Sequence, residues 1–388
     1  MRILHTIRSV DPRGGGVITA VLALAHASEA RGHSVEIVSL DLPGDDWVGK
    51  CPVRVHAMGA TPAKYGYSAR YVAWLRGQRD RFDAVVINGL WLFNGFGTWK
   101  ALRGGKTPYY VFPHGMLDPW FKRAYPLKHL KKWLYWPWAE YRVLRDARAV
   151  LFTSEEERRG ARESFWLYRC REEIVPLGML APPGPAGEQM EAFLQRFPGL
   201  RTARRWLFLG RLHEKKGCDL LLRSFAKIAA KIPDVQLIMA GPGHNGSLEA
   251  FQKMASELGL KDRVVWTGMI EGAVKWGAFR SAEVFILPSH QENFGLAVAE
   301  ALACETPVLI SNKVNIWREI AGDKAGLVGE DDQAGVDAML AEWAALSEAE
   351  RGAMRRNALD CFQTHFQMET LLRRLDQLFS PPGSPGGR

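Results

Sequence analysis

Short apolar runs alternate with longer helical runs along almost the whole chain. In the first half, the apolar runs predict strands over Arg2–Thr6, Ser34–Leu40, Ala84–Ile87, Tyr109–Phe112 and Ala149–Phe152, with helices over Gly14–Arg31 and Leu90–Arg103. In the second half, they predict strands over Trp206–Leu209, Gln236–Ala240, Val264–Trp266, Val284–Leu287 and Val308–Ile310, with helices over Asp219–Lys231, Gly246–Leu258 and Leu296–Cys304. This alternation, which occurs twice, predicts an α/β protein with two doubly wound parallel sheets.

A stretch rich in proline and glycine, Ala181–Gly187, separates the two alternating halves. Proline cannot donate to a strand ladder and breaks helices, so the stretch suits an interdomain linker. We therefore expect a first domain over residues 1–180, a linker over 181–203 and a second domain over 204–360. Residues 361–379 are expected to form a helix that packs back on the first domain, and residues 380–388 a disordered tail.

The composition predicts a soluble protein. None of the apolar runs in the 388 residues approaches the ~18 residues that a membrane span needs. The start of the chain lacks the apolar region and cleavage site of a secretory signal, which places the protein in the cytoplasm. Its five cysteines are scattered without a CxxC or Cys/His zinc spacing, so we expect reduced, buried thiols and no metal site.

The net charge of +9 is concentrated in the first half. Residues 1–180 hold 27 Lys and Arg against 17 Asp and Glu, which leaves 24 against 25 for the remainder. The segment 120–145 is basic and rich in tryptophan, which predicts a face for an anionic membrane surface. An ordinary basic helix that packs its tryptophans internally is the alternative. Nucleic acid would also suit the charge alone, but we expect no nucleic acid partner.

Glycine-containing loops follow several predicted strands. Asp11–Val17 opens the first helix, where backbone amides can approach a diphosphate, although a plain tight turn is an equal alternative. The loop Gly210–Gly217 carries Arg211 and Lys216, two cations that can reach one anion, and alone it would more often be a solvated turn.

The loop Gly241–Gly246 matches the G-x-G-x-x-G pattern of dinucleotide-binding proteins. Its context disfavours a nicotinamide cofactor. The match comes late in the chain. In dinucleotide-binding proteins, the acidic residue that binds the ribose lies at the end of the next strand, about twenty positions on, whereas Asp262 lies before that strand.

The stretch Ser289–Glu300 sets two carboxylates on either side of a loop-to-helix junction. Glu292 falls in the loop after a predicted strand, and Glu300 falls in the following helix. That helix would begin near Gly295, where backbone N–H groups have no intrahelical acceptor and can point at a phosphate or a sugar hydroxyl. The stretch therefore predicts half of an anion-and-sugar binding site.

His114 directly follows the predicted strand Tyr109–Phe112. A lone histidine is more often a surface or packing residue. In open parallel sheets, however, ligands bind beyond the carboxyl ends of the strands. A histidine at such a strand end is therefore a candidate for function.

Together these motifs resemble the retaining nucleotide-sugar glycosyltransferases of family 4, the group 1 glycosyltransferases, over nearly the whole chain. The most specific element is the E-x7-E signature from Glu292 to Glu300. The other matches are Gly14-Gly15-Gly16, His114-Gly115, Gly210-Arg211 with Lys216-Gly217, and the loop that contains Gly241. The resemblance implies the GT-B fold, in which two Rossmann-like doubly wound domains face each other across an interdomain cleft.

The resemblance also implies roles for individual residues. His114 and Glu292 would be catalytic, with Glu292 holding the donor sugar, while Arg211 and Lys216 bind the diphosphate. The implied donor-binding set is Gly15, Gly16, Arg211, Lys216, Met269, Asn293, Phe294, Gly295, Leu296 and Glu300, with Glu300 on the ribose. Asn88 and Trp91 would lie on the acceptor side. No cofactor and no metal are expected, since a metal-binding D-x-D is not found in the motif region.

The function implied by the resemblance is retaining, metal-independent transfer of a hexose-type sugar. The donor would be a GDP- or UDP-sugar and the acceptor a lipid-linked glycan of a surface polysaccharide, with the enzyme peripheral on the inner face of the cell membrane. A nucleotide-sugar 2-epimerase of the same architecture remains an alternative. Such an isomerase needs no acceptor.

Overall fold

The computed structural model describes residues 1–119, 122, 126–243 and 246–380. The chain folds into two compact units. Unit 1 comprises Met1–Gly178 and the segment from Met368 onward, and unit 2 comprises Met179–Gln367. The chain therefore passes from one unit to the other twice, after Gly178 and after Gln367.

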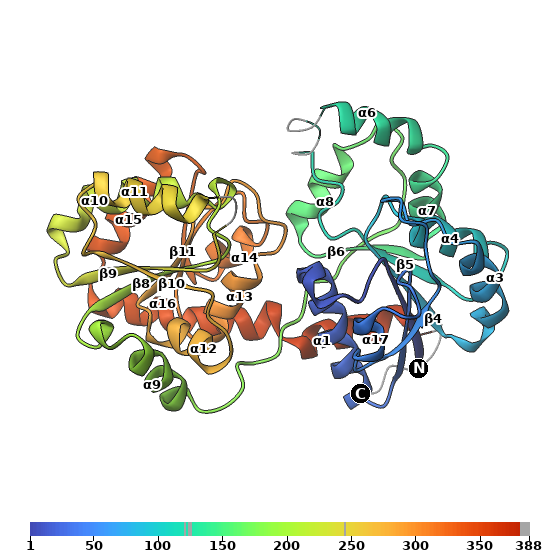
Figure 1. The fold of residues 1–388 in the computed structure, drawn as a ribbon, viewed down its shortest axis with the longest axis horizontal. Helices are drawn as coiled ribbons and strands as arrows, with labels where there is room; N and C mark the ends of the chain where they lie inside the picture. Colours follow the sequence, from blue (N-terminus) through green and yellow to red (C-terminus); the bar gives the residue numbers. More distant parts are fainter. Residues whose placement is uncertain (120–121, 123–125, 244–245, 381–388) are drawn as a thin grey trace. The chain divides into compact units, whose positions relative to one another are not determined.

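Unit 1 is built on a seven-stranded parallel sheet in the order β3-β2-β1-β4-β5-β6-β7 (Figure 1). Its strands are β1 (Arg2–Ile7), β2 (Ser34–Ser39), β3 (Arg54–Ala57), β4 (Ala84–Asn88), β5 (Tyr109–Phe112), β6 (Ala149–Phe152) and β7 (Glu172–Ile174). Its helices are α1 (Gly16–Ala30), α2 (Asp46–Gly49), α3 (Ala69–Gln78), α4 (Phe93–Leu102), α6 (Pro126–Tyr135), α7 (Glu140–Asp146), α8 (Glu155–Arg162) and α17 (Met368–Phe379), with 3-10 turns at η1 (Pro12–Gly14) and η2 (Arg79–Arg81).

The central strands of unit 1 bury both faces, as parallel strands covered by helices must. Along β4, Val85 and Ile87 join the core beneath α3, α4 and α7, while Ala84 and Val86 join the core on the other face. That second core includes five side chains of α17, which lies beside α1 in Figure 1. The hydroxyl of Tyr110 also donates to the carbonyl of Leu378 at 2.6 Å.

Unit 2 has a six-stranded parallel sheet in the order β10-β9-β8-β11-β12-β13. Its strands are β8 (Arg204–Leu209), β9 (Val235–Ala240), β10 (Val264–Gly268), β11 (Val284–Leu287), β12 (Val308–Ser311) and β13 (Gly326–Gly329). Its helices are α9 (Ala186–Arg196), α10 (Cys218–Ile228), α11 (Ser247–Glu257), α12 (Gly272–Ser281), α13 (Leu296–Ala303), α14 (Trp317–Gly322), α15 (Gln333–Ala345) and α16 (Glu348–Cys361), with 3-10 turns at η3 (Pro198–Leu200), η4 (Glu214–Lys216) and η5 (Ala229–Lys231) and a π-helix at η6 (Phe362–Phe366).

Two of the expected boundaries differ from the structure. The range 181–203, expected as a linker, contains α9, which belongs to unit 2 and packs on α12. The two helices meet closely because Gly277 has no side chain, and a Cβ there would clash with the Gln189 carbonyl. The expected helix 361–379 is also divided, since η6 belongs to unit 2 and α17 to unit 1. Of the expected tail, residues 381–388 lie outside the described residues.

All five cysteines are free, and Cys218, Cys304 and Cys361 are buried, whereas Cys51 and Cys170 are partly exposed. Among the helices of the described residues, none combines the length and the apolar character that a bilayer span requires.

Each sheet reverses its strand order at one point. In unit 1 the reversal lies between β1 and β4, and in unit 2 it lies between β8 and β11. Loops at such a switch point diverge and leave room for a ligand at the carboxyl end of the sheet. The loops after β8 and β11 hold Arg211, Lys216 and Glu292, so the topology brings these sequence-predicted residues to the switch point of unit 2.

Candidate functional site

The loops that follow β8 and β11 are fastened to each other in unit 2. The hydroxyl of Ser289, which is fully buried, donates to the Lys215 carbonyl at 3.0 Å, and the backbone N–H of His290 donates to the same carbonyl at 2.9 Å. Gly217 adopts a φ of +68°, and the Pro288 carbonyl occupies the place where a side chain would begin. Glycine at 217 therefore allows the two loops to approach each other closely.

Lys216 and Glu292 form an ion pair across these two loops, with Lys216 Nζ against Glu292 Oε2. Both side chains are largely buried. Burial lowers the pKa of Lys216 to about 8, and the neighbouring charges of Lys215 and Arg211 act in the same direction. The site thus holds a cation whose solvation is poor and which would be stabilised further by an anionic ligand.

Glu292 is held by its backbone as well. Its N–H donates to the Lys313 carbonyl at 2.9 Å, and its own carbonyl accepts from the N–H of Asn315 at 3.0 Å. These bonds join the loop after β11 to the loop after β12. The side-chain amide of Asn315 also lies 3.5 Å from Asn293 Oδ1. Glu292 is therefore presented by a rigid frame.

Helix α13 begins directly after this loop, at Leu296. Gly295 caps it with a φ of +79° and lies so close to Val314 that a Cβ would come within 3.1 Å of that side chain. The first amides of a helix have no intrahelical acceptor and carry the positive end of its dipole. The buried ring of Phe294 anchors the junction by packing edge-on against Phe366, with ring centroids 5.6 Å apart.

Glu300 lies in the second turn of α13 and has a partner that the sequence did not reveal. Lys275 of α12 approaches it, with 2.8 Å between Lys275 Nζ and Glu300 Oε1. The same ammonium lies 4.2 Å from the centre of the Trp276 ring. Lys275 thus fixes the carboxylate that the motif assigns to the ribose, and no sequence pattern connects the two residues.

The remaining donor-side residues of unit 2 are more exposed. Arg211 is exposed on the loop after β8, and Met269 is 62% exposed after β10. The loop Gly241–Gly246 follows β9, and Gly241 passes directly over the Gly210 carbonyl with a φ of +136°. His244 and Asn245, within this loop, lie outside the described residues.

In unit 1, His114 is the first link of a neutral hydrogen-bonded chain. Its Nε2 donates to Asn88 Oδ1 at 3.2 Å, and Asn88 Nδ2 lies 3.3 Å from His5 Nδ1 and from the Thr6 carbonyl. Burial lowers the pKa of His114 to about 4. The pKa of His5 is also lowered to about 4, by burial and by the neighbouring His114. Both imidazoles are therefore uncharged near neutral pH.

The backbone that carries His114 is strained and clamped. His114 has a φ of +50°, a backbone conformation that residues other than glycine seldom adopt. The N–H of the next residue, Gly115, donates to the buried carboxylate of Glu157 at 2.6 Å. Glu157 also accepts from the backbone N–H of Thr153 at 2.7 Å. This glutamate, which sequence reasoning missed, holds the turn in its unusual conformation.

A cavity of about 540 Å³ opens at the switch point of unit 1. Asn88 lines it, as do Arg8, Arg13 and Met116. Beside it, Gly15 adopts a φ of +85° and caps α1, which begins at Gly16. Both glycines are exposed, so their backbone is accessible at the first turn of the helix.

Two family models match this chain. The model described as "Glycosyl transferases group 1" matches residues 195–359, and that described as "Glycosyl transferase 4-like domain" matches residues 15–178. The first covers the ion-paired loops of unit 2 and the second covers the strand ends of unit 1. The chain belongs to the group 1 glycosyltransferases.

Relatives of this glycosyltransferase include the D-inositol 3-phosphate glycosyltransferase of Corynebacterium jeikeium, 28% identical over 210 residues, or 52% of this chain and 50% of that protein. The phosphatidyl-myo-inositol mannosyltransferase of Mycolicibacterium smegmatis is 34% identical over 178 residues, which are 44% of each chain. The aligned region thus spans half or less of these two relatives. Sucrose-phosphate synthase of Thermosynechococcus elongatus has a similar structure over 97% of this chain and 98% of its own, with a TM-score of 0.74 and 20% identity. The GT-B fold is confirmed.

Trp91, expected on the acceptor side of the glycosyltransferase, is packed into unit 1. Its ring lies 5.3 Å from Phe165 and 5.9 Å from Trp136, and its Nε1 donates to the Met116 carbonyl at 3.1 Å. Its backbone has a φ of +68°, and its N–H donates to Glu140 Oε1 at 2.7 Å. Trp91 therefore supports the loop after β4.

Glu140 is fully buried, and its other oxygen has no hydrogen-bond partner. Burial raises the pKa of Glu140 to about 8, although the Trp91 N–H and the charge of Lys132 oppose this shift. The carboxyl group is thus protonated over much of the neutral range, which is consistent with its apolar surroundings.

The predicted site residues of the glycosyltransferase fall into two local groups. In unit 2, Lys216 and Glu292 touch, and the backbone from Asn293 to Leu296 runs directly into α13 above Glu300. In unit 1, Asn88 and His114 are hydrogen-bonded to each other. The sequence predicted these residues because they follow strands. It gave no sign that Lys275, Glu157 and Glu140 hold neighbouring parts of the two groups in place.

Proposed function

We propose that this protein transfers a hexose-type sugar from a GDP- or UDP-sugar to a lipid-linked glycan acceptor of a surface polysaccharide, with retention of configuration and without a metal or cofactor. The observation that carries the proposal is the cluster at the switch point of unit 2. There two loop cations, Arg211 and Lys216, two carboxylates, Glu292 and Glu300, and the glycine-capped start of α13 gather at the carboxyl end of one sheet.

Each part of this cluster suits one part of a nucleotide sugar. Arg211 and Lys216 can offset the charge that develops on the leaving diphosphate, a stabilisation that fixed cations provide without a metal. Glu292 and the amides from Asn293 to Leu296 can bind sugar hydroxyls. Glu300, held by Lys275, can accept both hydroxyls of a ribose. In this proposal the neutral imidazole of His114 provides a hydrogen bond to the reacting sugar.

The lipid acceptor is supported by the surface of α6 in unit 1. Leu127, Leu130 and Leu134 are 79%, 57% and 65% exposed, and Lys128 and Lys131 are exposed on the same short helix. Trp133 is 42% exposed and Trp138 is 69% exposed, whereas Trp136 is buried. Apolar and aromatic side chains beside lysines favour the headgroup region of an anionic membrane. The name of the mycobacterial relative, a phosphatidyl-myo-inositol mannosyltransferase, also refers to a lipid.

The test is nucleotide release by the full chain from a panel of GDP- and UDP-sugars, in the presence of a chelator, with and without a membrane lipid extract. Release from one donor that the extract stimulates, and that Glu292→Ala abolishes, is the expected result. The matched control is Glu342→Ala, which removes an exposed carboxylate of α15 in unit 2, outside the proposed cluster.

Two other outcomes would contradict the proposal. Conversion of a donor to its epimer without an acceptor would make the protein an isomerase. Full transfer activity in Glu292→Ala would show that this cluster is not the donor site. Loss of activity in chelator that Mg²⁺ or Mn²⁺ restores would contradict the metal-independent part alone.

A further inference from the structure

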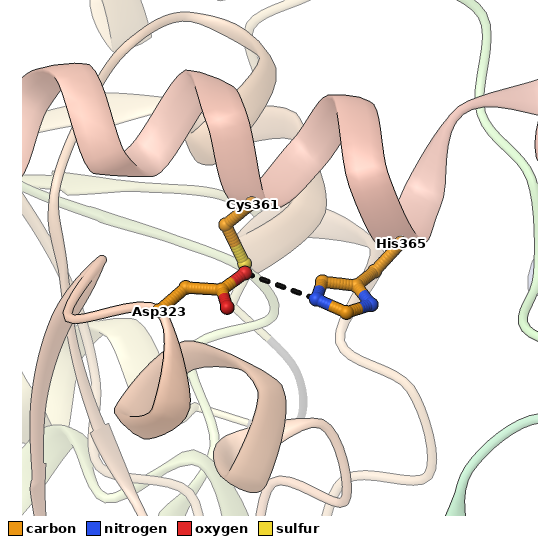
Figure 2. A group of neighbouring side chains, drawn as sticks. All are labelled: Asp323, Cys361 and His365. Atoms are coloured by element: carbon orange, nitrogen blue, oxygen red, sulfur yellow. Dashed lines mark hydrogen bonds and ion pairs between the residues drawn. The ribbon is translucent and has the colours of Figure 1, made fainter.

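Three side chains with metal-binding atoms converge in unit 2, away from the donor cluster described above. The ligand atoms of Asp323, Cys361 and His365 all lie within 4.8 Å of one another, the one such group of three among the residues that the structure describes. Figure 2 shows the three side chains pointing toward one point from two segments of the chain. His365 Nε2 and Asp323 Oδ2 are 3.0 Å apart.

The local structure holds these side chains in place. Cys361 ends α16, and His365 follows four residues later in the π-helix η6, so that both lie on one side of a continuous helical segment. Asp323 follows α14, and its N–H donates to the Glu319 carbonyl at 3.0 Å. Asn357 of α16 donates to the Lys324 carbonyl at 3.1 Å, which fastens the Asp323 loop to α16.

The π-helix is itself informative. Helices of this kind are rare, occur mostly as single turns within α-helices, and are frequent at functional sites. Here the turn spans five residues, Phe362–Phe366, and includes His365. The rare geometry thus coincides with one of the three metal-binding side chains.

The donor set is that of zinc. Zn²⁺ is borderline-soft and binds thiolate sulfur, imidazole nitrogen and carboxylate oxygen in tetrahedral sites, at roughly 2.0–2.3 Å. Ligand atoms around such an ion are separated by roughly 3.3–3.8 Å, so the three atoms require only small side-chain adjustments. A thiolate and a carboxylate also balance the two positive charges of the ion.

We propose that Asp323, Cys361 and His365 form a binding site for a divalent ion of the zinc class, with water at the fourth position. Binding takes the proton from the Cys361 thiol and releases it to solvent, and the ion replaces the hydrogen bond between His365 and Asp323. The side chains of His365 and Asp323 are 31% and 35% exposed, so the ion and the fourth ligand can enter from solvent. The proposal departs from the expectation of no metal site, which was drawn from the cysteine spacing.

The site is connected to the donor cluster through one residue. His365 precedes Phe366, whose ring packs against Phe294 at the start of α13. The Phe366 carbonyl also accepts from the N–H of Met179 at 2.8 Å. An ion at His365 would hold the π-helix and, through Phe366, the loop that precedes Gly295. The ion would act on stability and loop order and take no part in sugar transfer.

The experiment uses the full chain, stripped with a chelator and titrated with Zn²⁺ against a chromophoric competitor, and in parallel with Co²⁺. We expect one ion per chain and a thiolate-to-cobalt charge-transfer absorption. Cys361→Ser should lose this absorption and weaken Zn²⁺ binding by at least about tenfold. The matched control, Cys51→Ser, removes a thiol of unit 1 and should bind as the unchanged protein does.

Asp323→Asn gives an independent test, because asparagine keeps the shape and the hydrogen bond to His365 but is a poor zinc ligand. It should fold as the unchanged chain does, judged by circular dichroism, and should lose Zn²⁺-dependent protection against heat. No stoichiometric uptake of Zn²⁺ or Co²⁺ by the unchanged chain would overturn the proposal and leave a purely hydrogen-bonded cluster. Equal uptake by Cys361→Ser and the unchanged chain would overturn it as well. Neither readout depends on the glycosyltransferase activity.

Discussion

The switch points of the two units have the same topology but different polar groups. In unit 2 the site consists of charged side chains held as ion pairs, Lys216 with Glu292 and Lys275 with Glu300. In unit 1 the hydrogen-bonded core of the site is uncharged, since His114 and His5 have a pKa of about 4 and are joined through Asn88, while Arg8 and Arg13 line the cavity beside it. One fold therefore supports two kinds of site, which differ in the side chains at the strand ends, in the loops and on the adjoining helices.

This difference suits the two substrates of the proposed reaction. A nucleotide diphosphate needs positive charge, and ion pairs keep that charge in place before the ligand arrives. A sugar or a lipid-linked glycan needs neutral hydrogen-bonding groups and an apolar surface. The contrast predicts that substitutions in unit 2 affect charge stabilisation, whereas substitutions in unit 1 affect contacts of modest energy.

The largest effect is expected in unit 2. Lys216→Met keeps the length of the side chain but removes the cation, so kcat/KM for the donor should fall by roughly 100- to 1000-fold. Steady-state kinetics with the preferred donor would measure it. Lys253→Met removes an exposed lysine of α11 and should change little. A loss in Lys216→Met smaller than about tenfold would mean that the two units do not differ in the proposed way.

A smaller effect is expected at the surface of unit 1. The double substitution Leu130→Glu and Leu134→Glu places negative charge on the exposed face of α6 and should weaken binding to phosphatidylglycerol-containing vesicles by at least about tenfold. Sedimentation with vesicles would measure the partition. Leu42→Glu, at another exposed leucine of unit 1, is the control. Unchanged binding by the double variant, or equal binding of the unchanged protein to pure phosphatidylcholine, would show that α6 is not a surface for anionic lipid.

His114→Ala should reduce kcat/KM by about fivefold, because one neutral hydrogen bond contributes about 1 kcal/mol. Since the pKa of His114 is about 4, the ratio between the unchanged protein and the variant should stay constant from pH 5.5 to 8. His114→Gln, which keeps a donor, should recover part of the loss. A ratio that changes as the pH passes 6.5 would show that His114 gains a charge there, which would contradict a neutral site in unit 1.

The last effect concerns the stability of unit 1 and not the rate of sugar transfer. Glu140 holds its proton up to about pH 8 in the folded chain but loses it near pH 4.5 when unfolded. Its contribution to stability is therefore present below pH 4.5 and is lost as the pH rises toward 8, by at most about 1.4 kcal/mol per pH unit. Glu140→Gln can still accept from the Trp91 N–H and lacks this loss.

Thermal unfolding at a series of pH values would measure the effect. The midpoint of Glu140→Gln should rise relative to the unchanged protein between pH 5 and pH 8. Glu163→Gln, at an exposed position of unit 1, should show no such trend. A constant difference at all pH values would show that Glu140 is ionised in the folded protein.

Much of the fold could be predicted because central parallel strands are buried on both faces. Tyr109–Phe112, Ala149–Phe152 and Val284–Leu287 were predicted with the bounds that the structure shows. The strands that sequence reasoning missed, β3, β7 and β13, lie at the outer positions of the sheets. They are only partly buried and carry polar residues or glycine, so their pattern is weak.

Only those site residues that directly follow a predicted strand could be predicted from the sequence. Arg211, Lys216 and Glu292 follow buried strands, and parallel topology brings such loops together. Lys275 and Glu157 lie on helices, and their partners are distant in the sequence, so no spacing connects them. Trp91 was placed by its position after β4, but its packing against Phe165 depends on tertiary structure alone.

The discontinuity of unit 1 has a consequence for its synthesis. Five apolar side chains of α17 cover one face of the sheet of unit 1, yet the ribosome makes them after all of unit 2. Until Met368–Phe379 emerge, the nascent sheet must leave the apolar surface around Tyr110 and Phe112 exposed to water. The domain that is translated first is therefore completed last, and its uncovered apolar surface is prone to aggregation while the other domain is translated.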